Sequence, residues 1–203
     1  FRSVLNKSSV NIPDGIGLLH ASRVLSVFKG KKAIEERLSG VDLLQDICGL
    51  AEESGRKVFL LGGKGQVSEF AAQKLKIQYP TLLVDCHEGS RDIKNQTKQE
   101  LEETLNKIRD SKAEILFVGY GAPHQEIWVN DNKKTLEKIG IKVVMVVGGS
   151  YDIISGNIVR APKWMRRFGF EWLWRLIQEP WRWRRQLRIL KFLWLVLTKE
   201  VFS

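Results

Sequence analysis

The sequence predicts an α/β fold in which a mainly parallel, Rossmann-like sheet is flanked by helices and followed by a C-terminal amphipathic helical appendage. Four apolar, β-branched runs each end in glycine, helical stretches lie between them, and a basic, Trp-rich segment follows Pro162. Near-continuous apolar runs are typical of strands buried on both faces. Strands that alternate with helices favour a doubly wound parallel sheet.

The expected elements follow from these runs. Strands are expected at residues 56–63, 81–89, 113–121 and 141–149. Amphipathic spacing predicts helices at 67–79, 95–111 and 124–140, the last of them capped by Gly140. An apolar helix is also expected directly after "NIPDG". The two cysteines are too few for a disulfide framework and lack a metal-binding spacing.

The charge of the chain is unevenly distributed. Eleven of its 33 Lys and Arg residues, six of its seven Trp and only three of its 23 acids lie between Arg160 and Ser203. We therefore predict a nearly neutral domain at 1–159 and an appendage at 160–203 that binds an anionic membrane surface, phosphorylated lipid or nucleic acid. Pro180 should divide the appendage into two helices. Their apolar stretch is too short to span a bilayer, so lying on an anionic membrane face is favoured.

Asp14, in "NIPDGIGLLHASRVL", admits two interpretations. A carboxylate just before a helix is by default an N-cap. However, Gly15 and Gly17 follow at once and allow close approach of a ligand, which capping does not require. The residues alone leave both interpretations open.

Three glycine-containing loops follow the expected strands, namely "LLGGKGQ", "VGYGAPHQE" and "VVGGSYD". Ligands of open α/β sheets bind beyond the carboxyl ends of the strands. Each loop alone is more often structural, and neither a Walker loop nor a complete dinucleotide fingerprint is present. Together they favour a nucleotide-like ligand, because glycine lets backbone amides approach phosphate. His124 and Gln125 could contact such a ligand, or Glu126 could simply stabilise the first helical turn.

Several arginines are candidate phosphate ligands. Arg37 precedes a helix, and a functional role for it requires a phosphate nearby. Arg175, Arg182 and Arg185 are seven and three residues apart. Arginine suits forked contacts with phosphate, although general attraction to anionic lipids explains the same residues.

The segments "IPDGIGLLHASRVL", "ERLSGVDLL", "VFLLGGKG", "ILFVGYGAPHQEIW" and "VVGGSYDIISGNIVRAPKWMRRFGFEWLWRLIQEPWRWRR" together resemble the WecG/TagA/CpsF glycosyltransferases. The resemblance implies an inverting, metal-independent enzyme that needs no cofactor. Its expected substrates are a UDP-sugar, with N-acetylmannosamine as the expected sugar, and polyprenyl-diphosphate-linked N-acetylglucosamine. It also implies work at the cytoplasmic membrane face, as a peripheral protein of teichoic acid or related surface polysaccharide synthesis.

The resemblance also assigns residues. It implies that Asp14 is the catalytic base, which takes the proton of the acceptor hydroxyl. Substrate binding is assigned to Arg37 and Gln125, which would hold the donor or leaving group, to Asp152 at the nucleotide site, and to the motif glycines Gly15, Gly17 and Gly121. Binding of the lipid diphosphate is assigned to Arg175, Arg182 and Arg185.

The sequence also departs from the family pattern. A segment with a Thr/Asn-containing strand end is expected ahead of residue 1. Ser90 stands where an aromatic residue often follows glycine, and "KGKKAIEERL" is longer and more basic than usual. The alternatives are an inert nucleotide-sugar-binding or scaffold protein of a polysaccharide assembly complex and, more weakly, a nucleic-acid binder. The apolar appendage favours lipid over nucleic acid and is also suited to homo-oligomer formation.

Overall fold

The computed structural model describes residues 1–30 and 32–201, without the side chains of 182, 185, 186, 188–190, 193 and 199–201. Its contacts define two units. Unit 1 comprises Phe1–Asn11 and Gly40–Asn157, and unit 2 comprises Ile12–Ser39 and Ile158–Ser203. The boundary predicted between residues 159 and 160 lies close to the start of the second segment of unit 2, but the contacts also assign Ile12–Ser39 to that unit.

Unit 1 contains the predicted parallel sheet. Its strands are β1 (Val58–Gly62), β2 (Val84–His87), β3 (Ile115–Gly119) and β4 (Val143–Val146), in the order β2-β1-β3-β4. All three strand pairs are parallel, and the central strand β1 is buried throughout. Continuous burial of a central strand explains why its sequence is apolar without alternation.

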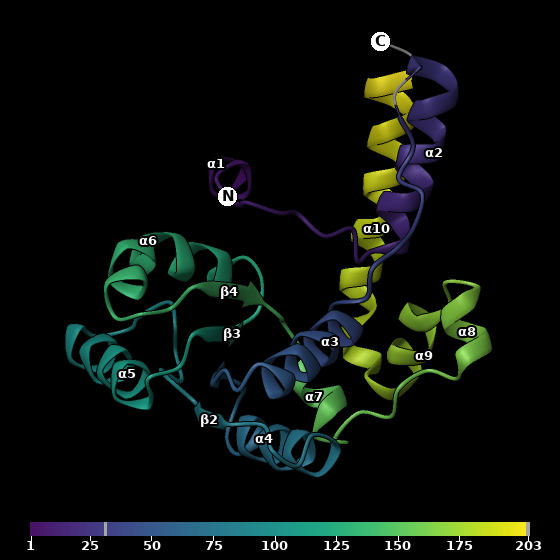
Figure 1. The fold of residues 1–203 in the computed structure, drawn as a ribbon. Coiled ribbons are helices and arrows are strands. Elements are labelled where there is room, and N and C mark those ends of the chain that lie inside the picture. Colours follow the sequence, from purple (N-terminus) through teal and green to yellow (C-terminus); the bar gives the residue numbers. More distant parts are fainter. Residues whose placement is uncertain (31, 202–203) are drawn as a thin grey trace. The chain divides into compact units, whose positions relative to one another are not determined.

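Two layers of helices cover this sheet (Figure 1). The chain moves one way from β1 to β2 and the other way from β2 to β3 and from β3 to β4. Right-handed crossovers then place the helix after β1 on one face and the helices after β2 and β3 together on the other. Side chains of β1 and β3 pack on one face with Ile108, Trp128 and Leu136 of the helices there. The helices of unit 1 are α1 (Arg2–Asn6), α3 (Gly40–Glu53), α4 (Val67–Gln78), α5 (Lys98–Ser111), α6 (His124–Lys138) and α7 (Ser150–Ile154).

The helix boundaries follow from local chemistry and confirm the predicted helices to within a few residues. Helix α5 starts later than predicted, because Thr97 and Glu100 form a reciprocal capping box. Helix α6 has Ile139 as its C-cap, and Gly140 follows with a φ of +100°. The expected glycine stop is therefore present, one residue beyond the cap.

Unit 2 is helical. Helix α2 (Ile16–Lys29) ends at Gly30, whose φ is +62°, and the returning chain is tied to it because Oγ of Ser22 accepts a hydrogen bond from the backbone N–H of Ile34 at 3.1 Å. Helix α2 lies beside the C-terminal helical segment (Figure 1). The remaining helices are α8 (Lys163–Arg167), α9 (Glu171–Gln178), the short η1 (Pro180–Arg182), α10 (Trp183–Leu195) and the π-helical η2 (Val196–Val201).

The appendage is interrupted at Pro180, as predicted, since α9 ends two residues before it and α10 begins after η1. Proline lacks the N–H that a continuing helix requires. Within residues 1–30 and 32–201, no helix combines the length and the apolar character needed to cross a bilayer.

Candidate functional site

Gln125 joins two of the loops at the carboxyl ends of the strands in unit 1. Its buried Oε1 accepts hydrogen bonds from the backbone N–H groups of Gly121 and Gly148, both at 3.0 Å. Gly121 follows β3 and Gly148 follows β4. The Nε2 of Gln125 donates to Oε1 of Glu126 at 3.1 Å. The side chain therefore holds the loops together, while its direct contact with a donor stays a prediction.

Tyr151 explains another of the glycines in unit 1. Its side chain is fully buried, and its hydroxyl donates to the backbone carbonyl of Phe117 at 2.9 Å. A Cβ on Gly119 would lie 2.5 Å from Cε2 of Tyr151, closer than two carbon atoms can approach. This glycine therefore serves packing. Burial also raises the pKa of the Tyr151 hydroxyl well above its ordinary value.

The other glycines have different surroundings. Gly121 has a φ of +81°, and a Cβ there would meet no atom within 4 Å. Gly15 also has open space at its Cβ position, whereas Gly17 lies in the first turn of α2. Open space at Gly15 and Gly121 leaves room for the ligand that the sequence predicts. Asp152 lies in the first turn of α7, directly after the β4 loop.

Asp14 in unit 2 is not the cap of α2. The N-cap residue is Gly15, and no side chain caps this helix. The capping interpretation of Asp14 is therefore wrong, because the helix begins one residue later than that interpretation requires. The Asp14 side chain is 61% exposed. Its carboxylate is thus accessible to a ligand and serves no capping function.

Arg37 is a residue of the predicted set that contacts Asp14 in the structure. Its Nε donates to the backbone carbonyl oxygen of Asp14 at 2.6 Å, and its Nη2 lies 3.5 Å from Oδ1 of the Asp14 carboxylate. Because a residue 23 positions later in the chain makes both contacts, the Asp14 turn is fixed by tertiary structure. Sequence spacing alone could not show this pairing.

Glu171, at the start of α9, is a site residue that the sequence interpretation missed. Its Oε2 accepts a hydrogen bond from Nη2 of Arg37 at 2.6 Å. Oε1 of the same carboxylate lies 4.0 Å from Nε of Arg160. Burial alone would lower the pKa of Arg37, but the hydrogen bond and charge of Glu171, together with Asp14, raise it above its ordinary value. The available signal was the acid in "GFEWLWRL", which lies within one of the segments that carry the family resemblance but received no role from it.

The appendage arginines are only partly described. Nε of Arg175, on α9, donates to Oε2 of Glu179 at 2.9 Å, and both side chains are largely buried. The side chains of Arg182 and Arg185 lie outside the described residues, so their predicted role in binding a lipid diphosphate stays a prediction. Helix α9 itself is anchored within unit 2, because Nε1 of Trp174 and Nε2 of Gln178 both donate to the backbone carbonyl of Val159.

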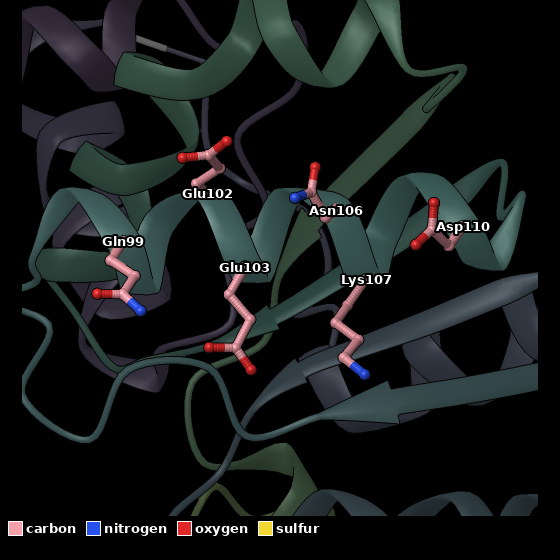
Figure 2. Close-up of a pocket in the computed structure, with 6 residues that line it drawn as sticks. All are labelled: Gln99, Glu102, Glu103, Asn106, Lys107 and Asp110. Carbon is pink, nitrogen blue, oxygen red and sulfur yellow. The ribbon is translucent and has the colours of Figure 1, made fainter.

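A hollow of about 320 Å³ lies elsewhere in unit 1, on the outer face of α5 (Figure 2). It is bordered by polar side chains of one helix, including the exposed Gln99 and Glu103, and none of the predicted site residues lines it. In the part of the chain that the structure describes, no group of three His, Cys, Asp or Glu side chains is arranged to hold a metal ion.

Comparison with known proteins shows which family and which individual proteins the chain is similar to. The model of the glycosyl transferase WecG/TagA/CpsF family matches residues 1–203. The chain is 32% identical over 197 residues to an N-acetylglucosaminyldiphosphoundecaprenol N-acetyl-beta-D-mannosaminyltransferase of Bacillus subtilis, covering 97% of this chain and 72% of that protein. It is 30% identical over 200 residues to a protein of the same name from Bacillus spizizenii, covering 98% of this chain and 72% of the relative.

Proposed function

Because the chain belongs to the glycosyl transferase WecG/TagA/CpsF family, and is thus a glycosyltransferase, we propose that it transfers a sugar from a UDP-sugar to a polyprenyl-diphosphate-linked N-acetylglucosamine. The two Bacillus relatives are named for an N-acetylmannosaminyl transfer to such a lipid. We propose that this chain transfers the same sugar, N-acetylmannosamine. The proposed context is synthesis of teichoic acid or a related surface polysaccharide at the cytoplasmic membrane face.

The observation that carries the proposal is the Asp14–Arg37 pair. A general base needs an accessible carboxylate, and Asp14 is largely exposed while its backbone is held by Arg37. A leaving diphosphate needs a positive group, and Arg37, which contacts Asp14, carries a permanent positive charge. Asp14 and Arg37, which contact each other in unit 2, are therefore proposed to supply the two kinds of group that the reaction requires.

The proposed reaction inverts the anomeric centre. The acceptor hydroxyl oxygen attacks the anomeric carbon while the bond from that carbon to the β-phosphate oxygen of UDP breaks. The hydroxyl proton passes to the carboxylate of Asp14, and the bonding electrons leave with UDP. Arg37 stabilises the negative charge that develops on the leaving oxygen, so the proposal includes a reaction without a metal ion or another cofactor.

The loops of unit 1 are proposed to bind the nucleotide part of the donor. Gln125 fixes the loops after β3 and β4, and Gly121 leaves space beside their backbone amides. Amides held in advance bind phosphate without a further ordering cost. In this proposal Gln125 acts mainly by holding the loops in shape, and Asp152 lies on the helix that follows them.

Unit 2 is proposed to contact the anionic membrane surface. Large apolar side chains around α8 and α9 are exposed, and among them Trp164 is 60% and Ile177 64% exposed. Farther along, the guanidinium of Arg184 lies 5.4 Å from the ring centre of Trp183. Aromatic residues beside cations on amphipathic helices suit the boundary between headgroups and acyl chains.

The reaction is tested by incubating the protein with UDP-N-acetylmannosamine and a short-chain polyprenyl-diphosphate-N-acetylglucosamine, with UDP release and the disaccharide-lipid product as readouts. We expect product formation that depends on both substrates and is unchanged by EDTA. Binding of UDP without any turnover of this or other UDP-sugars would instead favour an inert nucleotide-sugar-binding protein. Loss of activity with EDTA would contradict the metal-free reaction.

The membrane surface is tested by co-sedimentation with phosphatidylglycerol vesicles. We expect the double variant Trp164→Ala/Ile177→Ala to bind at least ~5-fold more weakly, because it removes two apolar contacts of order 1 kcal/mol each. Ile77→Ala, which removes an exposed apolar side chain from α4 in unit 1, is the matched control. Equal binding by all three proteins would contradict this surface, and a preference for RNA over vesicles would favour a nucleic-acid partner.

A further inference from the structure

We propose that Glu171 is a positioning residue that acts through Arg37 on the proposed transfer reaction. The inference rests on the proposed function and concerns how one acid on α9 holds an arginine of the chain before α3. Neither the sequence motifs nor the names of the relatives assign a role to this acid.

The nitrogen atoms of the Arg37 guanidinium have different partners. Nε is committed to the backbone carbonyl of Asp14, and Nη2 is shared between Glu171 at 2.6 Å and the Asp14 carboxylate at 3.5 Å. Nη1 of Arg37 takes part in none of these described contacts. The two committed nitrogens fix the plane of the guanidinium, and the remaining one can donate to a phosphate oxygen.

The second step is the asymmetry between the two acids that contact Arg37. The Asp14 side chain is 61% exposed, whereas that of Glu171 is 18% exposed. Asp14 is thus the carboxylate that a substrate can reach, and Glu171 is the one that stays within unit 2. The shorter contact is also made by the less accessible acid, so Glu171 dominates the orientation of the guanidinium.

The third step is the rigidity of the platform that carries Glu171. Helix α9 is tied to Val159 by Trp174 and by both polar atoms of the Gln178 amide, at 2.8 to 2.9 Å. Arg160, next to Val159, brings a second cation to 4.0 Å from Glu171. Attraction from two sides holds the carboxylate in place, which is the support that a positioning residue needs.

The consequence is kinetic. If Glu171 orients Arg37, its loss should misplace both the arginine and the turn of Asp14, while the donor can still bind through other contacts. We therefore expect kcat of Glu171→Ala to fall by roughly 10- to 100-fold, with a change in the donor KM of less than about 3-fold. Glu171→Gln keeps the size of the side chain and one acceptor oxygen, so its kcat should lie between those of Glu171→Ala and the wild-type protein.

The experiment is a double-mutant cycle of UDP release with Glu171→Ala, Glu171→Gln, Arg37→Ala and both combinations. In the Arg37→Ala background, either change at Glu171 should alter kcat by less than about 2-fold, because the group through which it acts is already gone. Thermal unfolding of each variant identifies any loss of folded protein. If Glu171→Ala is destabilised, the cycle is measured with the isosteric Glu171→Gln in its place.

A matched control is Glu114→Gln in unit 1. Glu114 also joins two cations, Arg56 at 2.8 Å and Lys142, and it is no part of the candidate site. This variant should keep its kcat. An unchanged kcat in Glu171→Ala, or an equal loss with and without Arg37, would overturn the inference alone, since wild-type UDP release would still stand. Absence of UDP release by the wild-type protein would instead contradict the proposed function, and this inference with it.

Discussion

The predicted site residues of the two units have different kinds of polar partner. In unit 1 the amide of Gln125 binds backbone N–H groups of Gly121 and Gly148, so a neutral side chain satisfies neutral backbone. In unit 2 Arg37 contacts the carboxylates of Asp14 and Glu171, so charged side chains contact one another. The first arrangement shapes loops, and the second leaves charges that a substrate can approach.

This difference has an energetic basis. A backbone N–H that loses its only acceptor costs stability, whereas its pairing with one particular acceptor contributes only modestly. The ion pair between Arg37 and Asp14 is exposed at its acidic end, and such pairs contribute little to stability. Substitutions in the unit 1 loops should therefore act mainly on the folded state, and substitutions in the Asp14 turn mainly on catalysis.

The largest expected effect is that of Asp14→Asn. Replacing a general base by a neutral amide of the same size should lower kcat by roughly 10²- to 10⁴-fold. The thermal midpoint and the affinity for UDP should stay close to those of the wild-type protein, because no side chain caps α2. UDP release, thermal unfolding and calorimetric titration with UDP measure the three quantities.

Glu35→Gln is the control for Asp14→Asn. Glu35 lies in the same unit, and its ion pair with Lys32 is highly exposed at both ends, so neither activity nor stability should change. If Asp14→Asn turned over normally, the assignment of the base would be wrong. If it lost stability by about 1 kcal/mol, as for a missing cap, the contrast between the two units would no longer hold.

Much of the fold could be predicted from the sequence because each element has a local signal. The apolar runs predicted four strands, and the structure shortens each of them by about two residues at either end. The break at Pro180 was predictable because proline excludes a continuing helix. What local patterns could not predict was the assignment of Ile12–Ser39 to the same unit as the appendage, since this depends on contacts between residues far apart in the chain.

The candidate site was less predictable for the same reason. Arg37 and Asp14 were each recognised by motif, but their contact spans 23 positions and follows from tertiary structure. Glu171 lies 134 positions from Arg37, and no periodicity reports such a pair. Gln125 was predicted to contact the donor, yet sequence could not show that two backbone amides already occupy its carbonyl oxygen.

The smaller expected effect, in the other unit, is that of Gln125→Leu. Leucine fills a similar volume but offers no acceptor, so the N–H groups of Gly121 and Gly148 lose their partner. We expect the free energy of unfolding to fall by about 1–3 kcal/mol, measured by urea denaturation. Gln99→Leu, on the exposed face of α5 shown in Figure 2, should change it by less than about 0.5 kcal/mol.

The affinity of Gln125→Leu for UDP separates the two roles of this residue. If Gln125 mainly holds the loops, stability and affinity should fall together, because the amides that bind phosphate become disordered when the loops separate. Full stability with a loss of affinity would show instead that the side chain contacts the ligand directly. In that case Gln125 of unit 1, like Asp14 and Arg37 of unit 2, would be available to substrate. The two units would then differ only in the charge of the side chains that contact it.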